Sequence, residues 1–427
     1  MYRNPIGKTL EERYKPLNNY VDLRKLNGTY PFNRISMSPL GSEICLTGSW
    51  ADEDSPCINF GSQDYLGITA HPALKDAARQ VIDEIGVSTG GTPLLGGTHQ
   101  LTIKLERKVA SILGTEQAQV YASGWSACFG GVSGLITPRD QIVMDVLMHN
   151  SSAVAAYSAT EYVKKFKHNN MEDLEKNLKA CRTKDDTNGL FVLVETLYSM
   201  NSDSPDLGKV YELCKAYNAI LIIDTTHDLG CMGKNGLGLL ESVDRTNWTD
   251  VVYMGSFSKV FGGTGGFVAG PRSIRYRIDV FSPSYTFASC ASPITYGIVL
   301  KAFEIIFSEE GEKMRIEVLR KINLAINELN KRGFLTNGSP SPIIPIIIGD
   351  LKLGRLISRE ILMHGLIANL VEFPAVPKDG TIIRFQMMCT MSDEHIIKAC
   401  EILYKAIQEA QRILIDIRID SIKIETD

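Results

Sequence analysis

The stretch Val251-Val-Tyr-Met-Gly-Ser-Phe-Ser-Lys-Val-Phe-Gly-Gly-Thr-Gly-Gly-Phe267 joins a short apolar run to a lysine in a glycine-rich loop. The apolar run predicts a buried strand over residues 251–255, and the glycines after Lys259 allow the backbone to approach a phosphate closely. Such a lysine suits two roles, a phosphate clamp or an amine that forms an imine, and a surface lysine with neither role is the third reading. A nucleotide-binding Walker loop has its glycines before the lysine, so the spacing argues against that kind of clamp.

Two further apolar runs, Gly189-Leu-Phe-Val-Leu-Val-Glu195 and Ala219-Ile-Leu-Ile-Ile-Asp224, also predict buried parallel strands. Helical periods over residues 74–85 and 101–113 give the alternation of βαβ units. Ligands of open α/β sheets bind beyond the carboxyl ends of the strands. We therefore expect Glu195, Asp224 and the loop around Lys259 to converge on one site.

The length of 427 residues exceeds one core of ordinary size and predicts more than one domain. We expect an N-terminal arm over residues 1–55, which could reach across a partner, a large domain over 56–300 and a smaller C-terminal domain over 301–427. The last domain contains a Pro-rich apolar run at 339–348. Its tail, residues 413–424, alternates apolar and polar side chains and is typical of a half-buried strand.

The composition is that of a folded globular protein, with 44% hydrophobic and 22% charged residues. A net charge of −4 offers no basic field for nucleic acid. The nine cysteines are scattered without a Cys-x-x-Cys pair, which favours reduced thiols in the core. No signal peptide and no apolar stretch of membrane-spanning length is visible, so we expect a cytoplasmic protein without stable membrane insertion.

Asp224 ends the second apolar run and is followed by Thr225-Thr-His227. A carboxylate at a buried strand end is costly unless it is paired with a cation, and a protonated pyridine nitrogen is such a cation. A helix cap is the alternative for a lone aspartate. Together with Lys259, about thirty-five residues later, Asp224 favours pyridoxal 5′-phosphate (PLP), held by Lys259 as a Schiff base.

The same residues belong to an ordered series of motifs from about Asn59 to Ile396 that resembles the α-oxoamine synthases. These include 5-aminolevulinate synthase, 8-amino-7-oxononanoate synthase, glycine C-acetyltransferase and serine palmitoyltransferase. The series consists of residues 59–67, 96–99 with 105–106, 123–125, 145–149, 195–200, 224–227, the lysine loop, and 373–377 leading to Arg384. The resemblance implies PLP fold-type I, an α/β fold like aspartate aminotransferase with a mostly parallel central sheet and a smaller α+β C-terminal domain.

The resemblance also implies roles for individual residues. Lys259 would act as the general base, and His149 would stack on the cofactor ring and orient the substrate carboxylate. His227 would donate to the phenolic oxygen of the ring, and Asp224 would hold its pyridinium proton. The remaining expected cofactor-binding residues are Ser123, Gly124, Trp125, Ser256 and Ser289, of which Ser289 reaches the phosphate of the neighbouring subunit; those expected to bind substrate are Arg384, Gln63 and Ser199.

The implied reaction is an acyltransferase reaction, the decarboxylative condensation of serine, alanine or glycine with an acyl thioester to give an α-amino ketone. The carrier would be coenzyme A or acyl carrier protein, and the protein would be a homodimer with its site at the subunit interface. The segments 166–171, 198–200 and 373–377 are most similar to those of serine palmitoyltransferases. Thr225, Gln63 and Pro93 depart from common family residues, and Pro93 favours lipid or secondary-metabolite biosynthesis. An aminotransferase or another PLP reaction, and a non-catalytic partner subunit, are the alternatives.

Overall fold

The computed structural model describes residues 4–47 and 56–426, which form two compact units. One unit spans Gln63–Leu319, and the other joins the described residues up to Ser62 to those from Arg320 onward. The described N-terminal residues thus belong to the same unit as the C-terminal residues, and the strands of both segments pair within that unit. Residues 1–3 and 48–55 of the expected arm lie outside the described residues.

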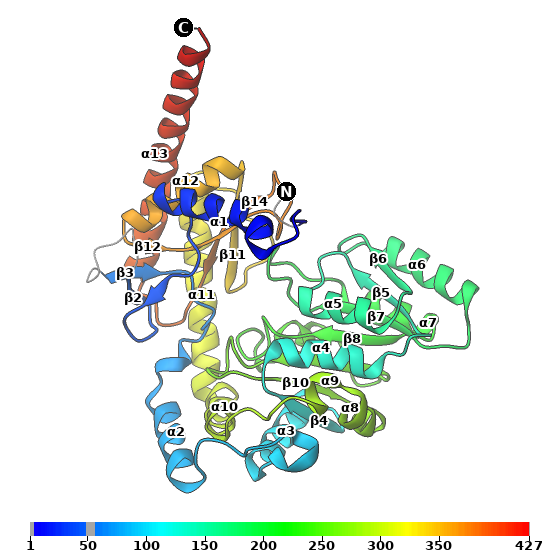
Figure 1. The fold of residues 1–427 in the computed structure, drawn as a ribbon. Helices are drawn as coiled ribbons and strands as arrows, with labels where there is room; N and C mark the ends of the chain where they lie inside the picture. Colours follow the sequence, from blue (N-terminus) through cyan, green and yellow to red (C-terminus); the bar gives the residue numbers. More distant parts are fainter. Residues whose placement is uncertain (1–3, 48–55, 427) are drawn as a thin grey trace. The chain divides into compact units, whose positions relative to one another are not determined.

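The unit Gln63–Leu319 is built on a seven-stranded sheet with the order β4-β10-β9-β8-β7-β5-β6 (Figure 1). The strands β5 to β9 pair in parallel, and β10 is antiparallel to both of its neighbours. The sheet is therefore mostly parallel, as predicted. The bounds of its strands are β4 (Gln117–Tyr121), β5 (Gln141–Asp145), β6 (Val163–Phe166), β7 (Leu190–Glu195), β8 (Ile220–Asp224), β9 (Val251–Ser256) and β10 (Gly266–Gly270).

The three apolar runs identified in the sequence are β7, β8 and β9, and they lie side by side in the sheet. Nearly all of their side chains are buried, which is why they read as continuous apolar runs instead of alternating ones. Their register places Glu195 opposite Asp224. The polar residues at their carboxyl ends therefore meet at one edge of the sheet.

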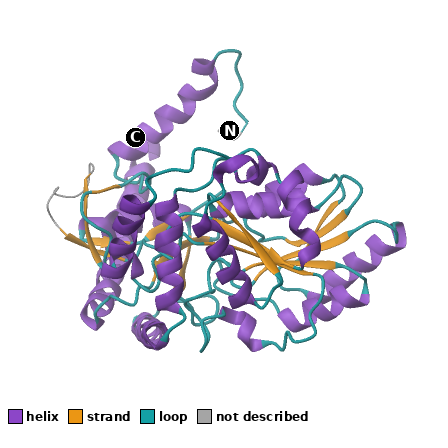
Figure 2. Cartoon of the chain, turned by 90° about the horizontal axis from the view of Figure 1, so that it is seen from below, coloured by secondary structure: helices purple, strands orange, loops and turns teal. Residues whose placement is uncertain are grey.

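Helices lie above and below the strands, as Figure 2 shows. Two of them begin directly beyond strand ends, α4 with Ser123 as N-cap and α5 with His149 as N-cap. The helices of this unit are α2 (Pro72–Glu84), α3 (Gln100–Leu113), α4 (Gly124–Leu135), α5 (Asn150–Ala159), α6 (Met171–Lys184), α7 (Leu207–Ala216), α8 (Arg275–Phe281), α9 (Pro283–Thr286) and α10 (Pro293–Ile306), with short turns η1 (Ile68–Ala70), η2 (Pro93–Gly97), η3 (Gly238–Ser242) and η4 (Arg272–Ile274).

The second unit contains two small sheets. Its four-stranded sheet has the order β1-β2-β3-β12, and its three-stranded antiparallel sheet has the order β11-β14-β13. The parallel pairing of β3 with β12 ties the N-terminal strands to the C-terminal part of the chain. The elements are α1 (Leu10–Leu26), β1 (Ile35–Ser36), β2 (Glu43–Thr47), β3 (Pro56–Asn59), β11 (Ile343–Gly349), α12 (Leu351–Met363), β12 (Leu366–Ile367), β13 (Asn369–Val371), β14 (Thr381–Gln386) and α13 (Asp393–Thr426). The boundary between the units falls within α11 (Glu309–Lys331).

The prediction of a strand over residues 413–424 is wrong. These residues continue α13, which runs from Asp393 to Thr426. The helical period of the preceding residues decides the conformation: Ile396, Cys400, Leu403, Ala406 and Ala410 are buried along one face. A helix satisfies its backbone hydrogen bonds within itself, whereas a strand needs a neighbour, and no strand of the described residues pairs with this segment.

Candidate active site

A cavity of about 290 Å³ lies at the carboxyl ends of the central strands. It is lined by residues that follow β4, β5, β7, β8 and β9, as expected for an open α/β sheet. The lining residues are Ser123, Gly124, Trp125, Cys128, His149, Ser151, Glu195, Asp224, Thr226, His227, Ser256, Ser258, Lys259, Thr264 and Gly265.

One wall of the cavity is the N-terminus of α4. Ser123 caps this helix, and its hydroxyl accepts a hydrogen bond from the backbone N–H of Ser126 at 3.1 Å. Gly124 packs directly on Ser256, and a Cβ added at Gly124 would overlap the Ser256 hydroxyl. This close approach requires glycine at position 124. It places the N-terminus of α4 beside the Ser256 hydroxyl, and backbone N–H groups and a hydroxyl in this arrangement suit an anion.

The lysine loop contributes a second group of hydroxyls. The Ser256 and Ser258 hydroxyls lie 2.7 Å apart, and the Ser256 hydroxyl is 3.3 Å from the carbonyl oxygen of Gly265. Lys259, which follows, is partly buried and lines the same cavity. The loop therefore places an amine and two hydroxyls beside the N-terminus of α4.

Asp224 is 5% exposed and is held through both carboxylate oxygens. Its Oδ1 accepts from the backbone N–H of Thr226 at 3.0 Å, and its Oδ2 accepts from the thiol of Cys128 at 3.3 Å. Burial and the nearby charge of Asp224 raise the pKa of the Cys128 thiol, so that the thiol remains a donor. The two donors fix the orientation of the carboxylate at the cavity wall.

Two histidines line the cavity. His227 is buried, and its Nδ1 lies 2.9 Å from the hydroxyl of Tyr65, which fixes the orientation of the ring. His149 is exposed, and its Nδ1 lies 2.7 Å from the Ser151 hydroxyl. The backbone N–H of His149 donates to Glu195 Oε1 at 2.6 Å.

Glu195 is an unusual group for the end of a buried strand. Burial, and after it the charge of Asp224, hold the pKa of its carboxyl well above the usual value, while the hydrogen bond from His149 opposes them. The cavity therefore contains two carboxyl groups in different environments.

Nine of the residues predicted for the site line this cavity: Lys259, His149, Ser123, Gly124, Trp125, Glu195, Asp224, His227 and Ser256. The other four predicted residues are not among the described residues that form the wall of the cavity. Gln63 is partly buried in the loop before Asp64, Ser199 is buried in the loop after β7, and Ser289 is exposed after α9. Arg384 is 9% exposed on β14 of the other unit.

Cys128, Ser151, Thr226, Ser258, Thr264 and Gly265 line the cavity but were not among the predicted site residues. Helical spacing could have indicated Cys128, because it lies one turn after Gly124 on α4. Thr225 replaces a residue that is common in the α-oxoamine synthases, and the structure shows which neighbour its side chain contacts. Its hydroxyl donates to the Met254 carbonyl oxygen of β9 at 3.0 Å, so this side chain faces the neighbouring strand.

These residues fit PLP. The Gly124–Ser256 contact, the capped N-terminus of α4 and the hydroxyls around it suit a phosphate, and a buried carboxylate suits a pyridinium nitrogen. A lysine lines the same cavity and offers an amine for covalent attachment.

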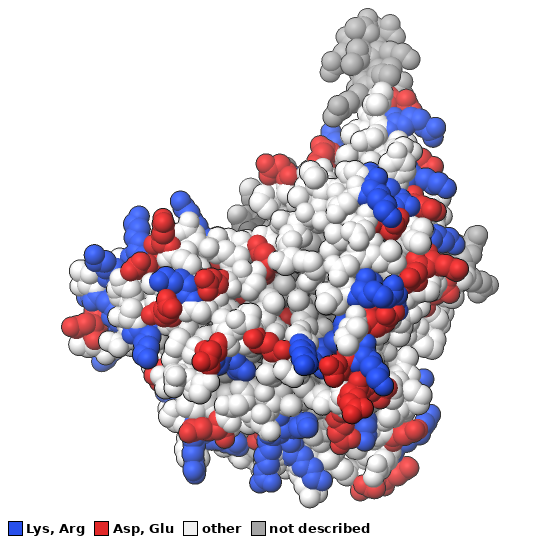
Figure 3. Space-filling view, turned by 180° about the vertical axis from the view of Figure 1, so that it is seen from behind, with Lys and Arg blue, Asp and Glu red and all other residues white. Residues whose placement is uncertain are grey.

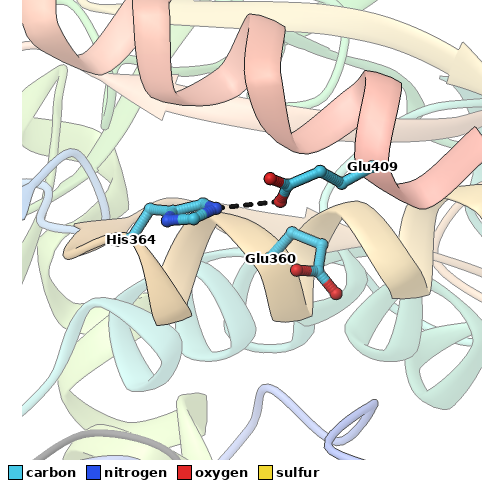
Figure 4. A group of neighbouring side chains, drawn as sticks. All are labelled: Glu360, His364 and Glu409. Carbon is cyan, nitrogen blue, oxygen red and sulfur yellow. Dashed lines mark hydrogen bonds and ion pairs between the residues drawn. The ribbon is translucent and has the colours of Figure 1, made fainter.

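A second cluster, Glu360, His364 and Glu409, lies in the other unit (Figure 4). Its ligand-type atoms lie within 4.8 Å of one another, but each group already has an ionic or hydrogen-bonding partner. His364 Nε2 is 2.9 Å from Glu409 Oε2, and Glu360 Oε1 accepts from Arg359 at 2.8 Å. We interpret the cluster as two ion pairs, one within α12 between Arg359 and Glu360, and one that joins His364 at the end of α12 to Glu409 of α13.

On the face drawn in Figure 3, lysine and arginine side chains are interspersed with aspartate and glutamate side chains. Among the described residues, no helix combines the length and apolar character needed to cross a bilayer.

Comparison with known proteins agrees with the fold and with PLP as the cofactor. Residues 55–403 match the family described as aminotransferase class I and II. A serine palmitoyltransferase of Sphingobacterium spiritivorum is 29% identical over 393 residues, which cover 92% of this chain and 96% of that protein. An 8-amino-7-oxononanoate synthase of Fervidobacterium nodosum is 29% identical over 387 residues, covering 90% of this chain and 95% of that protein. A high-resolution structure of SPT with a PLP internal aldimine has the same fold, with a TM-score of 0.87 at 22% identity over 95% of this chain and 100% of that one.

The sheet, the cavity and the lysine loop define a PLP-dependent protein of fold-type I. The chain belongs to the aminotransferase class I and II family, and its relatives are α-oxoamine synthases, the group indicated by the sequence motifs.

Proposed function

We propose that this protein is a PLP-dependent acyltransferase that condenses an amino acid with an acyl thioester, in the manner of serine palmitoyltransferase. The amino acid is serine, alanine or glycine, and the thioester is an acyl-CoA or an acyl carrier protein conjugate. The observation that carries this proposal is that Lys259, Asp224, His227 and His149 line one and the same cavity.

PLP, when bound, supplies an electron sink for negative charge that forms at the α-carbon of the amino acid. Lys259 would hold the cofactor covalently until the amine of the amino acid takes its place, and the amine of Lys259 released in that exchange would accept the α-proton of the substrate as general base. The Asp224 carboxylate would hold a proton at the ring nitrogen. The Ser123 and Ser256 hydroxyls, with the backbone N–H groups of α4, would bind the phosphate.

The histidines would have separate tasks. His227, oriented by Tyr65, would donate a hydrogen bond to the phenolic oxygen of the cofactor. His149 is exposed in the cavity wall, so its ring can contact both cofactor and substrate. We propose that it stacks on the ring, orients the substrate carboxylate and stabilises the thioester oxyanion.

Substrate recognition would involve Arg384, Gln63 and Ser199. The guanidinium group of Arg384 matches a carboxylate with two parallel hydrogen bonds, and its burial on β14 would strengthen that pair. Gln63 and Ser199 would contact the amino acid through their polar side chains.

We further propose a homodimer in which Ser289 reaches the cofactor phosphate of the neighbouring subunit. Its side chain is exposed, and it is not part of the described wall of the cavity in its own chain. Size-exclusion chromatography with light scattering tests the dimer.

All nine cysteines are free thiols, which supports a reducing compartment, and we propose the cytoplasm.

The deciding experiment uses purified protein loaded with PLP. Titration with glycine, alanine and serine should change the visible absorbance of the cofactor, and addition of an acyl thioester should release free thiol and CO2. Amino-group transfer to a keto acid without a thioester would favour an aminotransferase. Cofactor binding without reaction across acyl-CoA and acyl carrier substrates would contradict the acyltransferase.

A further inference from the structure

Behind the cavity wall, His168 lies between two carboxylates. It follows β6, and its ring sits between Asp145, at the end of β5, and Asp203, in the loop after β7. Its Nδ1 lies 3.0 Å from Asp145 Oδ1, and its Nε2 lies 2.9 Å from Asp203 Oδ2. An imidazole that faces an acceptor at each nitrogen satisfies both only when both nitrogens carry a proton. The ring is therefore an imidazolium that links the two carboxylates.

The surroundings of His168 support this charge. Burial lowers its pKa, but the hydrogen bonds and charges of Asp145 and Asp203 outweigh burial and raise the pKa of His168 to about 9. The ring of Tyr198 packs edge-on against the imidazole, with centroids 4.6 Å apart. The side-chain nitrogen of Asn169 also lies 3.3 Å from Nε2, but it is a donor and makes no hydrogen bond to a protonated Nε2; it donates to the Ser204 carbonyl oxygen at 3.3 Å, while Nε2 has its shorter contact with Asp203 Oδ2 at 2.9 Å. The backbone N–H of Asn169 donates to Asp145 Oδ2 at 3.1 Å.

The Asp145 side of this link leads to one wall of the cavity. Asp145 Oδ1, which accepts the hydrogen bond from the imidazolium Nδ1–H, also accepts from the backbone N–H of Leu147 at 2.8 Å. This bond shapes the turn that ends at His149. The backbone N–H of His149 in turn donates to Glu195 at 2.6 Å.

The Asp203 side leads to the segment after Glu195. The carbonyl oxygen of Asp203 accepts from the backbone N–H of Tyr198 at 2.9 Å, and the Tyr198 carbonyl accepts from Ser202 at 2.8 Å. Backbone hydrogen bonds thus hold the two ends of the loop 198–203 together, and the Asp203 side chain joins this loop to His168. The charge of His168 also lowers the pKa of Glu195, against the effect of burial.

We propose that His168 is a positioning residue whose imidazolium ties the turn carrying His149 to the loop that follows Glu195, and so holds His149 and Glu195 in place in the cavity wall. The proposal rests on the proposed function in assigning His149 to cofactor and substrate. His168 does not line the cavity among its described wall residues, so it acts through its two carboxylate partners.

The pH dependence has a defined sign. The pKa of His168 in the folded protein is raised above the unfolded value of about 6.5, so the stabilisation is complete below that value and is lost as the pH rises through about 9. Thermal unfolding of cofactor-free wild type and His168→Gln should therefore differ near neutral pH, and the difference should shrink toward about pH 10. A difference that does not change over this range would contradict an imidazolium link.

The functional test compares PLP-loaded His168→Gln with wild type. The visible circular dichroism of bound PLP reports the placement of His149 whether or not any substrate reacts. This dichroism should differ between His168→Gln and wild type. Exchange of the amino-acid α-proton in D2O, followed by NMR, should slow by about tenfold or more at saturating amino acid, since small displacements at a reacting centre are costly. The dissociation constant of PLP should change by less than about threefold, because the variant leaves Asp224, Lys259 and the α4 N-terminus in place.

His364→Gln is the matched control. It removes a histidine from another ion pair of 2.9 Å, with Glu409 in the other unit, and should leave the dichroism and exchange at wild-type values. Asp203→Asn is the second variant, because Asp203 is 28% exposed in its side chain and the change preserves its shape. Without that charge, the pKa of His168 falls. We expect α-proton exchange to decline when His168 loses its proton at alkaline pH, and in Asp203→Asn this decline should occur at lower pH than in wild type.

Unchanged dichroism in both His168→Gln and Asp203→Asn would overturn the positioning role. A loss of PLP affinity as large as the loss of exchange would also overturn it, because it would indicate general damage to the site. If wild type exchanges no α-proton and releases no thiol, the proposed function fails, while the dichroism of the variants still decides the role of His168.

Discussion

The thiol of Cys128 donates a hydrogen bond to Asp224 Oδ2 across 3.3 Å, from the first turns of α4 to the end of β8. The two residues are 96 positions apart in the chain. The bond means that a side chain of the proposed phosphate-binding helix also orients the carboxylate proposed to hold the pyridinium nitrogen.

Cys128→Ala is expected to destabilise the cofactor-free protein by about 1–2 kcal/mol more than Cys214→Ala, because a hydrogen bond to a charged group is lost in addition to packing. Cys214 is the matched control, since it is buried on α7 and burial alone raises its thiol pKa. Urea unfolding measures both variants. Equal losses would show that the Cys128–Asp224 bond contributes nothing measurable.

Lys259→Ala should abolish the visible absorbance of covalently held PLP and lower α-proton exchange by about a thousandfold or more, since both the attachment and the base are removed. Absorbance spectra and NMR exchange measure the two effects. Lys209→Ala, which removes an exposed lysine on α7, should behave as wild type. Survival of absorbance and exchange in Lys259→Ala would refute the assignment of the cofactor lysine.

Gly124→Ala should weaken PLP binding by about tenfold or more, because the added methyl group overlaps Ser256 and forces the proposed phosphate site apart. Cofactor fluorescence gives the dissociation constant. Gly208→Ala is the control: it lies in the first turn of α7, where a Cβ meets neighbours only at ordinary distances of 3.5 Å and more. Its affinity for PLP should not change, and an equal effect of the two substitutions would argue against the contact.

Arg384→Lys should raise the KM for the amino acid by about 10-fold to 100-fold with a smaller change in kcat, because lysine cannot form the paired hydrogen bonds of a guanidinium group. Steady-state kinetics or the absorbance titration measures it. Arg320→Lys alters an exposed arginine paired with Asp393 and should leave KM unchanged. If Arg384→Lys keeps the wild-type KM, the α-carboxylate is bound elsewhere.

The sequence alone determined features whose causes are local. Continuous apolar runs predicted β7, β8 and β9, and the polar residue at the end of each run indicated where a site would form. The glycines after Lys259 and the motif order then indicated PLP and the α-oxoamine synthases. A continuous apolar run and a glycine-rich turn are properties of adjacent residues, so they can be recognised without a structure.

Only the tertiary structure decided how distant segments meet. Cys128 reaches Asp224, and His168 joins Asp145 to Asp203, because parallel strands far apart in sequence end at the same edge of one sheet. The alternation at 413–424 predicted a strand, but these residues continue a helix. A strand exists only where another strand offers hydrogen bonds, and the presence of that neighbour is a property of the fold, not of the segment.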